Sequence, residues 1–223
     1  MVETFLGEVL IDPFAVMNTI GLVAFALVGA AKAIRERFDI FGILVVGLVV
    51  AFGGGATRDV LVGRIPLALQ NVGEIALGTL GVSLALALSF LLDSPDDHPI
   101  TLVADAIGLA AFATAGAIVA TEAGIPSFGV VAVATINAVG GGAYADILLD
   151  RSPFILFEDF YASPAVLGGL SFWAVTTVGW TVAPAAAMCA TVTVGTRLVA
   201  VSRGWHLPTA QTLGLARDVD GSE

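Results

Sequence analysis

Residues 20–66 read IGLVAFALVGAAKAIRERFDIFGILVVGLVVAFGGGATRDVLVGRIP, and residues 107–153 repeat them as IGLAAFATAGAIVATEAGIPSFGVVAVATINAVGGGAYADILLDRSP. The two stretches align at a shift of 87 residues without a gap, and 21 of the 47 aligned pairs are identical. Shared apolar composition alone does not produce this agreement, so the chain contains an internal duplication. Each copy carries a glycine triplet followed by an aspartate, and this shared motif sets the expected fold and site.

The composition around the repeat is that of a membrane protein. Of 223 residues, 57% are hydrophobic and 13% are charged, which does not describe a soluble chain. One helical crossing of a bilayer needs about 20 apolar residues. We therefore predict an all-α polytopic membrane protein with seven transmembrane helices, near 14–34, 40–62, 72–92, 100–120, 128–149, 164–181 and 183–201.

The repeat contains an odd number of spans, and this fixes its symmetry. Repeat 1 covers about 14–92 and repeat 2 about 100–181, with three spans each, so the second copy must enter the membrane inverted. Inverted repeats are typical of transporters and channels, with the site at the repeat interface. A membrane scaffold without a pathway is the alternative. We expect one transmembrane domain over 1–202, with the seventh helix near 183–201 and a short acidic cytoplasmic tail over 203–223.

The distribution of lysine and arginine predicts the orientation. With the N-terminus outside the cell, the inner face receives Lys32, Arg35, Arg37, Arg151, Arg197, Arg203 and Arg217, and the outer face receives Arg58 and Arg64. Basic residues favour the cytoplasmic side. We therefore expect a multi-pass protein of the cell membrane, in contact with the lipid bilayer, whose C-terminus is cytoplasmic.

The overall charge excludes some functions. Nine basic residues stand against nineteen acidic ones, so nucleic acid is not an expected partner. The acidic exterior is compatible either with a halophilic source or with ordinary solvated loops, at positions such as Glu3, Glu8, Asp93, Asp96, Asp97, Glu158, Asp159, Asp218, Asp220 and Glu223. The single Cys189 excludes an intramolecular disulfide. No nucleophile with a base, metal-ligand cluster or cofactor loop is recognisable, so we expect no enzyme activity, metal or cofactor.

The two glycine triplets, Gly53, Gly54, Gly55 and Gly140, Gly141, Gly142, interrupt strong helical runs. Each glycine costs about 1 kcal/mol relative to alanine inside a helix, so the triplets are expected to break or kink their helices. Unpaired backbone groups must then face protein or water, and their carbonyl oxygens could replace part of a cation's hydration shell. The alternative is close helix packing, which small residues permit.

Polar residues lie near both triplets, and ionisable groups within spans usually face a partner or water. The candidate pathway residues are Arg58, Asp59, Asn137, Tyr144, Asp146 and Asp105. Under the inverted topology Asp59 lies toward the outer mouth and Asp146 toward the inner one, where both would attract cations. Two alternatives stay open: the aspartates can be helix-end residues that reach the interface, and a buried carboxylate near Arg58 or Lys32 can form a structural ion pair.

In combination these motifs resemble the prokaryotic branch of the trimeric intracellular cation (TRIC) channels, also catalogued as a duplicated glycine-transporter domain. The resemblance covers about residues 14–200 and rests on the FG pairs at 41–42 and 128–129, the two triplets with their aspartates, and FYASP at 160–164. It implies a homotrimer of seven-helix subunits, each with its own pore for potassium and other monovalent cations. The second and fifth helices, with the two triplets as kinks, would line that pore.

The chain departs from this pattern at two positions. The second copy has Ala145 where the first has Arg58, and the first span has Asn18 where relatives often carry an aspartate. The first functional hypothesis is a passive potassium channel with Asp59 and Asp146 as electrostatic filters. The second is a secondary transporter of a small zwitterion such as glycine, in which Asp105 would bind the amine.

Overall fold

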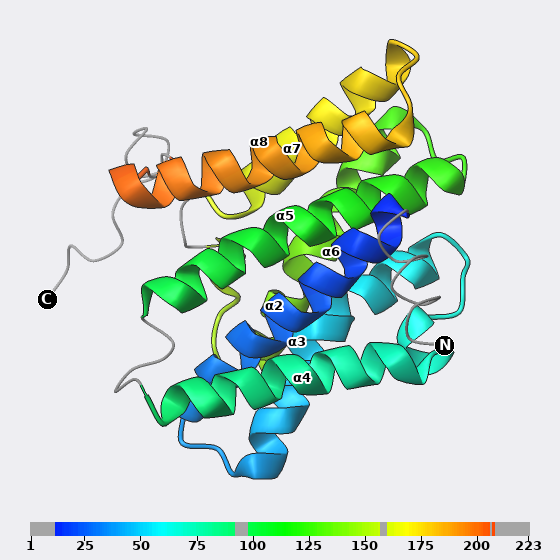
Figure 1. Ribbon diagram of the computed structural model, residues 1–223. Coiled ribbons are helices and arrows are strands. Elements are labelled where there is room, and N and C mark those ends of the chain that lie inside the picture. Colours follow the sequence, from blue (N-terminus) through cyan, green and yellow to red (C-terminus); the bar gives the residue numbers. More distant parts are fainter. Residues whose placement is uncertain (1–11, 92–97, 157–159, 206, 208–223) are drawn as a thin grey trace, which may run out of the picture.

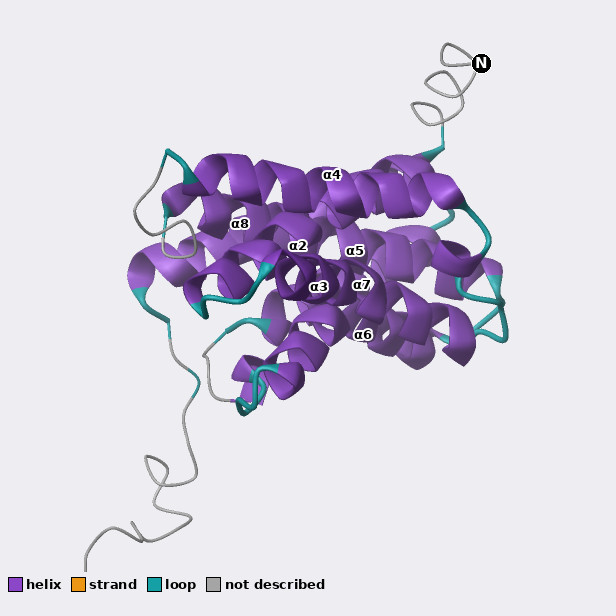
Figure 2. Ribbon diagram, turned by 90° about the horizontal axis from the view of Figure 1, so that it is seen from below, coloured by secondary structure: helices purple, strands orange, loops and turns teal. Residues whose placement is uncertain are grey.

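The computed structural model describes residues 12–91, 98–156, 160–205 and 207. Within these residues the chain is helical, with no strand (Figure 2). The elements are α2 (Pro13–Arg35), α3 (Ile40–Leu61), η1 (Leu67–Leu69), α4 (Val72–Ser89), α5 (Pro99–Glu122), α6 (Ser127–Leu148), η2 (Phe154–Leu156), α7 (Ala162–Thr177) and α8 (Val182–Arg203). Most of the acidic positions named above lie outside the described residues, as does nearly all of the predicted tail.

Six of the described helices, all except α7, are long and apolar enough to cross a membrane. Together with α7 they confirm the predicted seven-helix membrane fold. The sixth span was predicted to end at residue 181, but α7 ends at Thr177. Gly179 has a φ of +87°, which is a left-handed conformation that ends a helix. The chain is a multi-pass membrane protein.

Helices α2 and α5 form the centre of the molecule. Helix α2 packs on α3, α4 and α5, and α5 packs on α2, α6, α7 and α8. In Figure 1, α4 and α8 lie at opposite edges with α2 and α5 between them. In the first repeat α3 and α4 therefore pack around α2, and in the second repeat α6 and α7 pack around α5. Helix α8 lies outside the repeat.

The duplication is visible in the helix ends. Left-handed backbone occurs at Arg37 and Gly63 in repeat 1, and at Gly124 and Asp150 in repeat 2. Each position in the second pair lies 87 residues after its counterpart in the first. The chain therefore turns out of corresponding helices in the same way in both repeats, although the residue types differ.

The contacts between the repeats show that they are inverted. A side chain at Gly21 would overlap the Phe112 ring, and one at Gly108 would overlap the Phe25 ring. The two rings themselves meet edge to face with centroids 5.1 Å apart. The earlier residue of α2, Gly21, meets the later residue of α5, Phe112, and the later residue Phe25 meets the earlier residue Gly108. The two helices therefore run antiparallel, and these four residues lie around the pseudo-two-fold axis.

The glycine triplets do not break their helices, so this part of the prediction was wrong, while the predicted kink stays a prediction. Both triplets lie within the continuous helices α3 and α6. A side chain at Gly54 would overlap the backbone carbonyl of Asn137, and one at Gly141 would overlap that of Val50. The triplets therefore permit close contact of the α3 and α6 backbones, as the packing alternative predicted. These pairs also show that α3 and α6 run antiparallel.

Candidate functional site

Two cavities lie at opposite ends of the central helix pair. The repeat-1 cavity, of about 380 Å³, is lined by Phe14, Arg58, Asp59, Arg64, Ile65, Leu67, Gln70 and Val119. The repeat-2 cavity, of about 290 Å³, is lined by Val28, Lys32, Arg35, Thr101, Leu102, Asp105, Asp146, Arg151, Ser152, Phe154, Tyr161 and Arg197. Phe14 and Lys32 are separated by about 27 Å along α2, given a rise of 1.5 Å per residue. This distance is close to the thickness of a bilayer core.

The two cavities correspond under the repeat. Asp59, Arg64 and Leu67 line the first, and the residues 87 positions later, Asp146, Arg151 and Phe154, line the second. The inverted duplication has therefore produced one polar cavity per repeat, at opposite ends of the molecule.

The predicted aspartates make matching hydrogen bonds at the bottom of these cavities. The backbone N–H of Leu67 donates to Oδ2 of Asp59, and that of Phe154 donates to Oδ2 of Asp146, both at 2.9 Å. Each carboxylate thereby caps the short 3₁₀ helix that follows its own α-helix. Asp59 and Asp146 thus have a structural role in addition to any effect on ions.

The cation beside each carboxylate differs between the repeats. In repeat 1 the neighbouring Arg58 binds Asp59, with Nη2 2.7 Å from Oδ1, and only 2% of its side chain is exposed. In repeat 2 the cation is Lys32 from α2, whose Nζ is 3.5 Å from Oδ1 of Asp146 with 19% of the side chain exposed. The ammonium also lies over the Phe154 ring, 4.4 Å from its centroid. The ion pair in repeat 1 is therefore shorter and more completely buried.

A second pair of polar contacts also follows the repeat. Nδ2 of Asn18 donates to both carboxylate oxygens of Glu74, at 3.1 and 2.9 Å. In repeat 2 the hydroxyl of Tyr161 donates to Oδ1 of Asp105 at 2.8 Å. Asp105 and Tyr161 lie 87 residues after Asn18 and Glu74. In repeat 1 the donor is on the first helix and the carboxylate follows later in the chain, at Glu74. In repeat 2 the carboxylate is on the first helix and the donor follows later, at Tyr161.

Helix α8 adds a cation to the repeat-2 contact. Nη2 of Arg197 is 3.5 Å from Oδ2 of Asp105, and its guanidinium carbon lies 4.5 Å from the centroid of the Tyr161 ring. Burial, and then the Asp105 charge, raise the pKa of the Tyr161 phenol well above its usual range. The phenol therefore stays protonated and acts as a donor at neutral pH.

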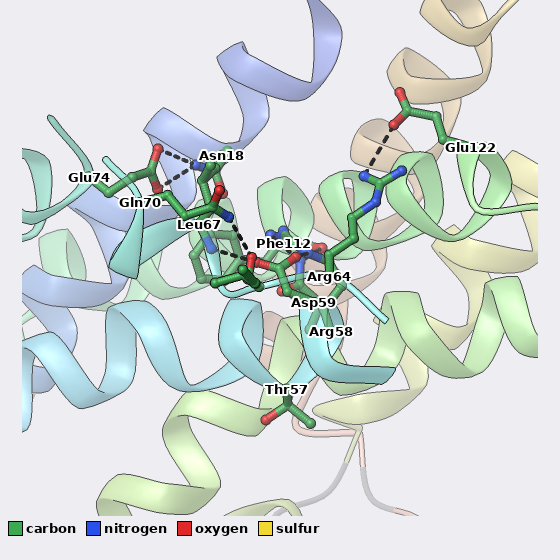
Figure 3. Close-up of polar contacts among 12 residues, drawn as sticks. Asn18, Thr57, Arg58, Asp59, Arg64, Leu67, Gln70, Glu74, Phe112 and Glu122 are labelled. Atoms are coloured by element: carbon green, nitrogen blue, oxygen red, sulfur yellow. Dashed lines mark hydrogen bonds and ion pairs between the residues drawn. The ribbon is translucent and has the colours of Figure 1, made fainter. Parts of the chain in front are cut away.

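Figure 3 shows how the repeat-1 residues are arranged. Arg58, Asp59 and Leu67 lie together beside the Asn18–Glu74 contact, and Arg64 extends toward Glu122. Thr57 points away from this group. Its hydroxyl oxygen is 2.8 Å from that of Tyr144, which is its own repeat counterpart.

Tyr144 lies apart from both cavities. With Val45, Leu48, Val49, Phe52, Gly53, Ala56, Ile147 and Leu148 it lines an apolar groove between α3 and α6. Of the six polar candidates, the structure thus places Asp105 and Asp146 together in one cavity and Arg58 and Asp59 in the other.

Asn137 occupies the crossing between the two cavities. It is fully buried, and its Nδ2 donates to the backbone carbonyl of Phe112 at 2.6 Å. Its Oδ1 has no hydrogen-bond partner. The ideal Cβ position at Gly55 is 3.8 Å from this oxygen and from Nη2 of Arg58. The absent side chain of Gly55 therefore leaves space beside both polar groups.

Sequence reasoning missed Glu74, Tyr161 and Arg197 as site residues, and it named Lys32 only as a basic residue of the inner face and as a candidate ion-pair partner. The repeat offered one usable signal, because a shift of 87 residues pairs Asn18 with Asp105 and Glu74 with Tyr161. Nothing comparable identifies Arg197, which lies outside the duplication. No group of three potential metal-ligating side chains occurs among the described residues.

The family profile described as glycine transporter matches residues 15–91 and 102–177, which are the two repeats. The chain belongs to the glycine transporter family. Similar members include the UPF0126 membrane protein YvgT of Bacillus subtilis, with 40% identity over 74% of this chain and 79% of that protein. The inner membrane protein YadS of Escherichia coli is 31% identical over 86% of this chain and 92% of its own length.

Solved structures relate this glycine transporter family fold to TRIC channels. A structure determined for conductance through TRIC cation channels has 35% sequence identity and a TM-score of 0.78, over 87% of this chain and 95% of that one. The TRIC channel orthologue of Rhodobacter sphaeroides has 28% identity and a TM-score of 0.76, over 86% and 98%. The predicted resemblance to prokaryotic TRIC channels is confirmed.

Proposed function

We propose that this protein is a passive channel for monovalent cations, potassium above all, with one pathway in each subunit of a homotrimer. The pathway runs between the repeats, from the repeat-1 cavity past the α3–α6 crossing to the repeat-2 cavity. The observation that carries the proposal is the pair of cavities with charged lining residues, equivalent under the repeat and open at opposite ends of α2 and α5. Both contain carboxylates, and each of these carboxylates has a basic side chain beside it with which a permeating cation would compete.

The solved relatives support the cation assignment, since they are described as TRIC cation channels. The basic-residue distribution supports a cytoplasmic repeat-2 cavity, because Lys32, Arg35, Arg151 and Arg197 all line it. We therefore place the repeat-1 cavity at the outer face and the C-terminus inside the cell. Homotrimer assembly rests on the relatives, which are named as trimeric channels.

A secondary transporter of a small zwitterion is the second candidate, because the family itself is described as glycine transporter. The proposed amine site argues against it. Asp105 already accepts from Tyr161 and pairs with Arg197, so a substrate amine would have to displace a neighbouring guanidinium.

Flux measurements on purified protein in liposomes separate the two candidates. An imposed potassium gradient should collapse rapidly and without a co-solute if the protein is a channel. A parallel experiment imposes a glycine gradient. Saturable glycine exchange with no potassium flux above that of empty liposomes would overturn the channel proposal.

A further inference from the structure

Arg58 is a buried cation whose hydrogen bonds are incomplete. Its Nε donates to Oδ1 of Asp59 at 2.8 Å, and its Nη2 lies 2.7 Å from the same oxygen. The other carboxylate oxygen is occupied by the N–H of Leu67. Nη1 is buried and has no hydrogen-bond partner. An arginine that binds a carboxylate with both oxygens is held more strongly, so this guanidinium is fixed at one point only.

The guanidinium lies where the repeat-1 cavity meets the centre of the molecule. Arg58 lines that cavity, and with Asn18, Asp59 and Glu74 it also lines a second cavity of only about 10 Å³. On the inner side, the space left by Gly55 adjoins Nη2 of Arg58 and the unpaired Oδ1 of Asn137. A cation passing from one cavity to the other would have to pass the place that the guanidinium fills.

The second repeat has no such group. The residue equivalent to Arg58 is Ala145, which is fully buried in α6. The cation on Asp146 comes instead from the partly exposed Lys32. Only the repeat-1 half of the pathway is thus closed by a buried cation among the residues that the structure describes.

We propose that Arg58 is a tethered cation that closes the outer half of the pathway, in the position that a permeating monovalent cation takes beside Asp59 and Glu74. This inference rests on the channel function proposed above. A cation that enters the repeat-1 cavity is attracted by both carboxylates and repels the guanidinium. The arginine then moves outward into the cavity, where water can satisfy Nη1, and the ion takes its place. Opening is therefore a competition between two cations for the same carboxylates.

The cavity beside Arg58 has room for this movement. Its volume of about 380 Å³ is larger than that of a guanidinium group with several hydrating waters, since each water takes about 30 Å³. The Phe14 ring lies at this side, 5.3 Å from the guanidinium carbon, and offers an aromatic face to the displaced cation.

The test compares potassium flux in liposomes containing wild-type protein, Arg58→Ala and Arg58→Lys. Arg58→Ala gives repeat 1 the alanine that repeat 2 already has. We expect its flux to exceed that of the wild type by about tenfold, which corresponds to a closed state that the tethered cation favours by about 1.4 kcal/mol. Arg58→Lys keeps a tethered cation and should stay close to the wild type. Arg203→Ala, on the exposed end of α8, controls for the loss of one positive charge.

Guanidinium chloride added at low concentration supplies the sharper readout. In Arg58→Ala the free ion can occupy the vacated place, so it should reduce the raised potassium flux, whereas it should leave Arg58→Lys unaffected. A structural role for Arg58 would not produce this rescue. Arg58→Ala that is folded but conducts no faster than wild type, or whose flux guanidinium does not reduce, overturns the proposal.

Asp59→Asn provides a second variant should Arg58→Ala not fold. The asparagine oxygen can still accept from Leu67, but it no longer binds the guanidinium as an ion. The flux should rise if Arg58 closes the path, and it should fall if Asp59 serves only to attract ions. Failure of the channel function has a different signature, because wild type and every variant would then conduct no better than empty liposomes.

Discussion

The two ends of the central helix pair are built on the same framework but carry different charges. Asp59 and Asp146 each cap a following 3₁₀ helix with a bond of the same length. The cation that each carboxylate meets has nevertheless changed, from a buried arginine on the same helix to a partly exposed lysine on another. The contacts that hold the fold have therefore been kept through the duplication, while the charges along the proposed pathway have diverged.

The crossing at the centre differs from both ends because its glycines are the same in both repeats. Gly54 meets the backbone of Asn137, and Gly141 meets the backbone of Val50 in the equivalent way. Each contact is between a glycine and the backbone of the other helix, so either side chain would force the helices apart. The symmetry is thus strictest where the repeats touch, and weakest in the two cavities.

The largest expected effect follows from breaking that crossing. Gly54→Ala or Gly141→Ala places a methyl group on a carbonyl oxygen that cannot move without shifting its helix. We expect a loss of stability of about 3 kcal/mol or more, the upper end for overpacking a core, with loss of monodisperse protein in size-exclusion chromatography. Gly195→Ala is the matched control, since no neighbouring atom lies within 4 Å of its ideal Cβ position. Normal melting of Gly54→Ala would contradict the close contact.

The comparison of the two carboxylates predicts the next effect. Asp59→Ala leaves the guanidinium of Arg58 without its counter-ion, and we expect a cost of about 3 kcal/mol, the low end for a broken buried ion pair, because the repeat-1 cavity gives the guanidinium access to water. Asp146→Ala leaves Lys32, whose ammonium can turn to water, so we expect about 1–2 kcal/mol from the lost hydrogen bonds. Thermal melting of the purified variants in the same detergent compares the two.

The double variant Arg58→Ala/Asp59→Ala provides the control for this difference. It removes the stranded charge and should recover part of the stability lost in Asp59→Ala. Equal losses in Asp59→Ala and Asp146→Ala, without recovery in the double variant, would show that the two ion pairs are equivalent despite their different burial.

The sequence could predict the features of the fold that depend on local patterns, but not those that depend on contacts between helices far apart in the chain. Apolar runs and a gapless repeat were sufficient for the seven helices and their inversion, because each run must cross the same bilayer. The glycine triplets were predicted to break or kink their helices, since local helix propensity is unfavourable there. The structure keeps them helical because the backbone of the opposite helix fills the space that side chains would take, and no local pattern contains that information.

The site was predictable only in part for the same reason. Arg58, Asp59 and Asp146 follow the triplets directly and could be found by their position within a span. Glu74 occupies the first turn of α4, where an acidic residue is favourable at any helix N-terminus. Its contact with Asn18 joins residues 56 positions apart. Only the packing of α2 against α4 shows that the two side chains meet.

A smaller effect, on selectivity, is expected from Asp146→Asn. The asparagine oxygen can accept from Phe154 in place of the carboxylate, so the fold should be kept while one negative charge leaves the repeat-2 cavity. We expect the permeability of potassium relative to chloride to fall by a few-fold, in line with about 1 kcal/mol for two unit charges 4 Å apart in water. Reversal potentials in a salt gradient measure this ratio. Asp150→Asn, at an exposed position just after the end of α6, should leave it unchanged, and an unchanged ratio in both would remove Asp146 from the pathway.

The smallest effect is expected at the contact that joins the repeats outside the pathway. Tyr144→Phe removes the hydrogen bond to Thr57 at a cost of about 0.5–1.5 kcal/mol, and the ring can stay in its apolar groove. Potassium flux and selectivity should equal those of the wild type, because both hydroxyls face away from the two cavities. A variant that melts normally but no longer conducts would place the ion path along the α3–α6 groove instead. The symmetric cavities would then be only the packing consequence of the duplication, and their charges would no longer explain conduction.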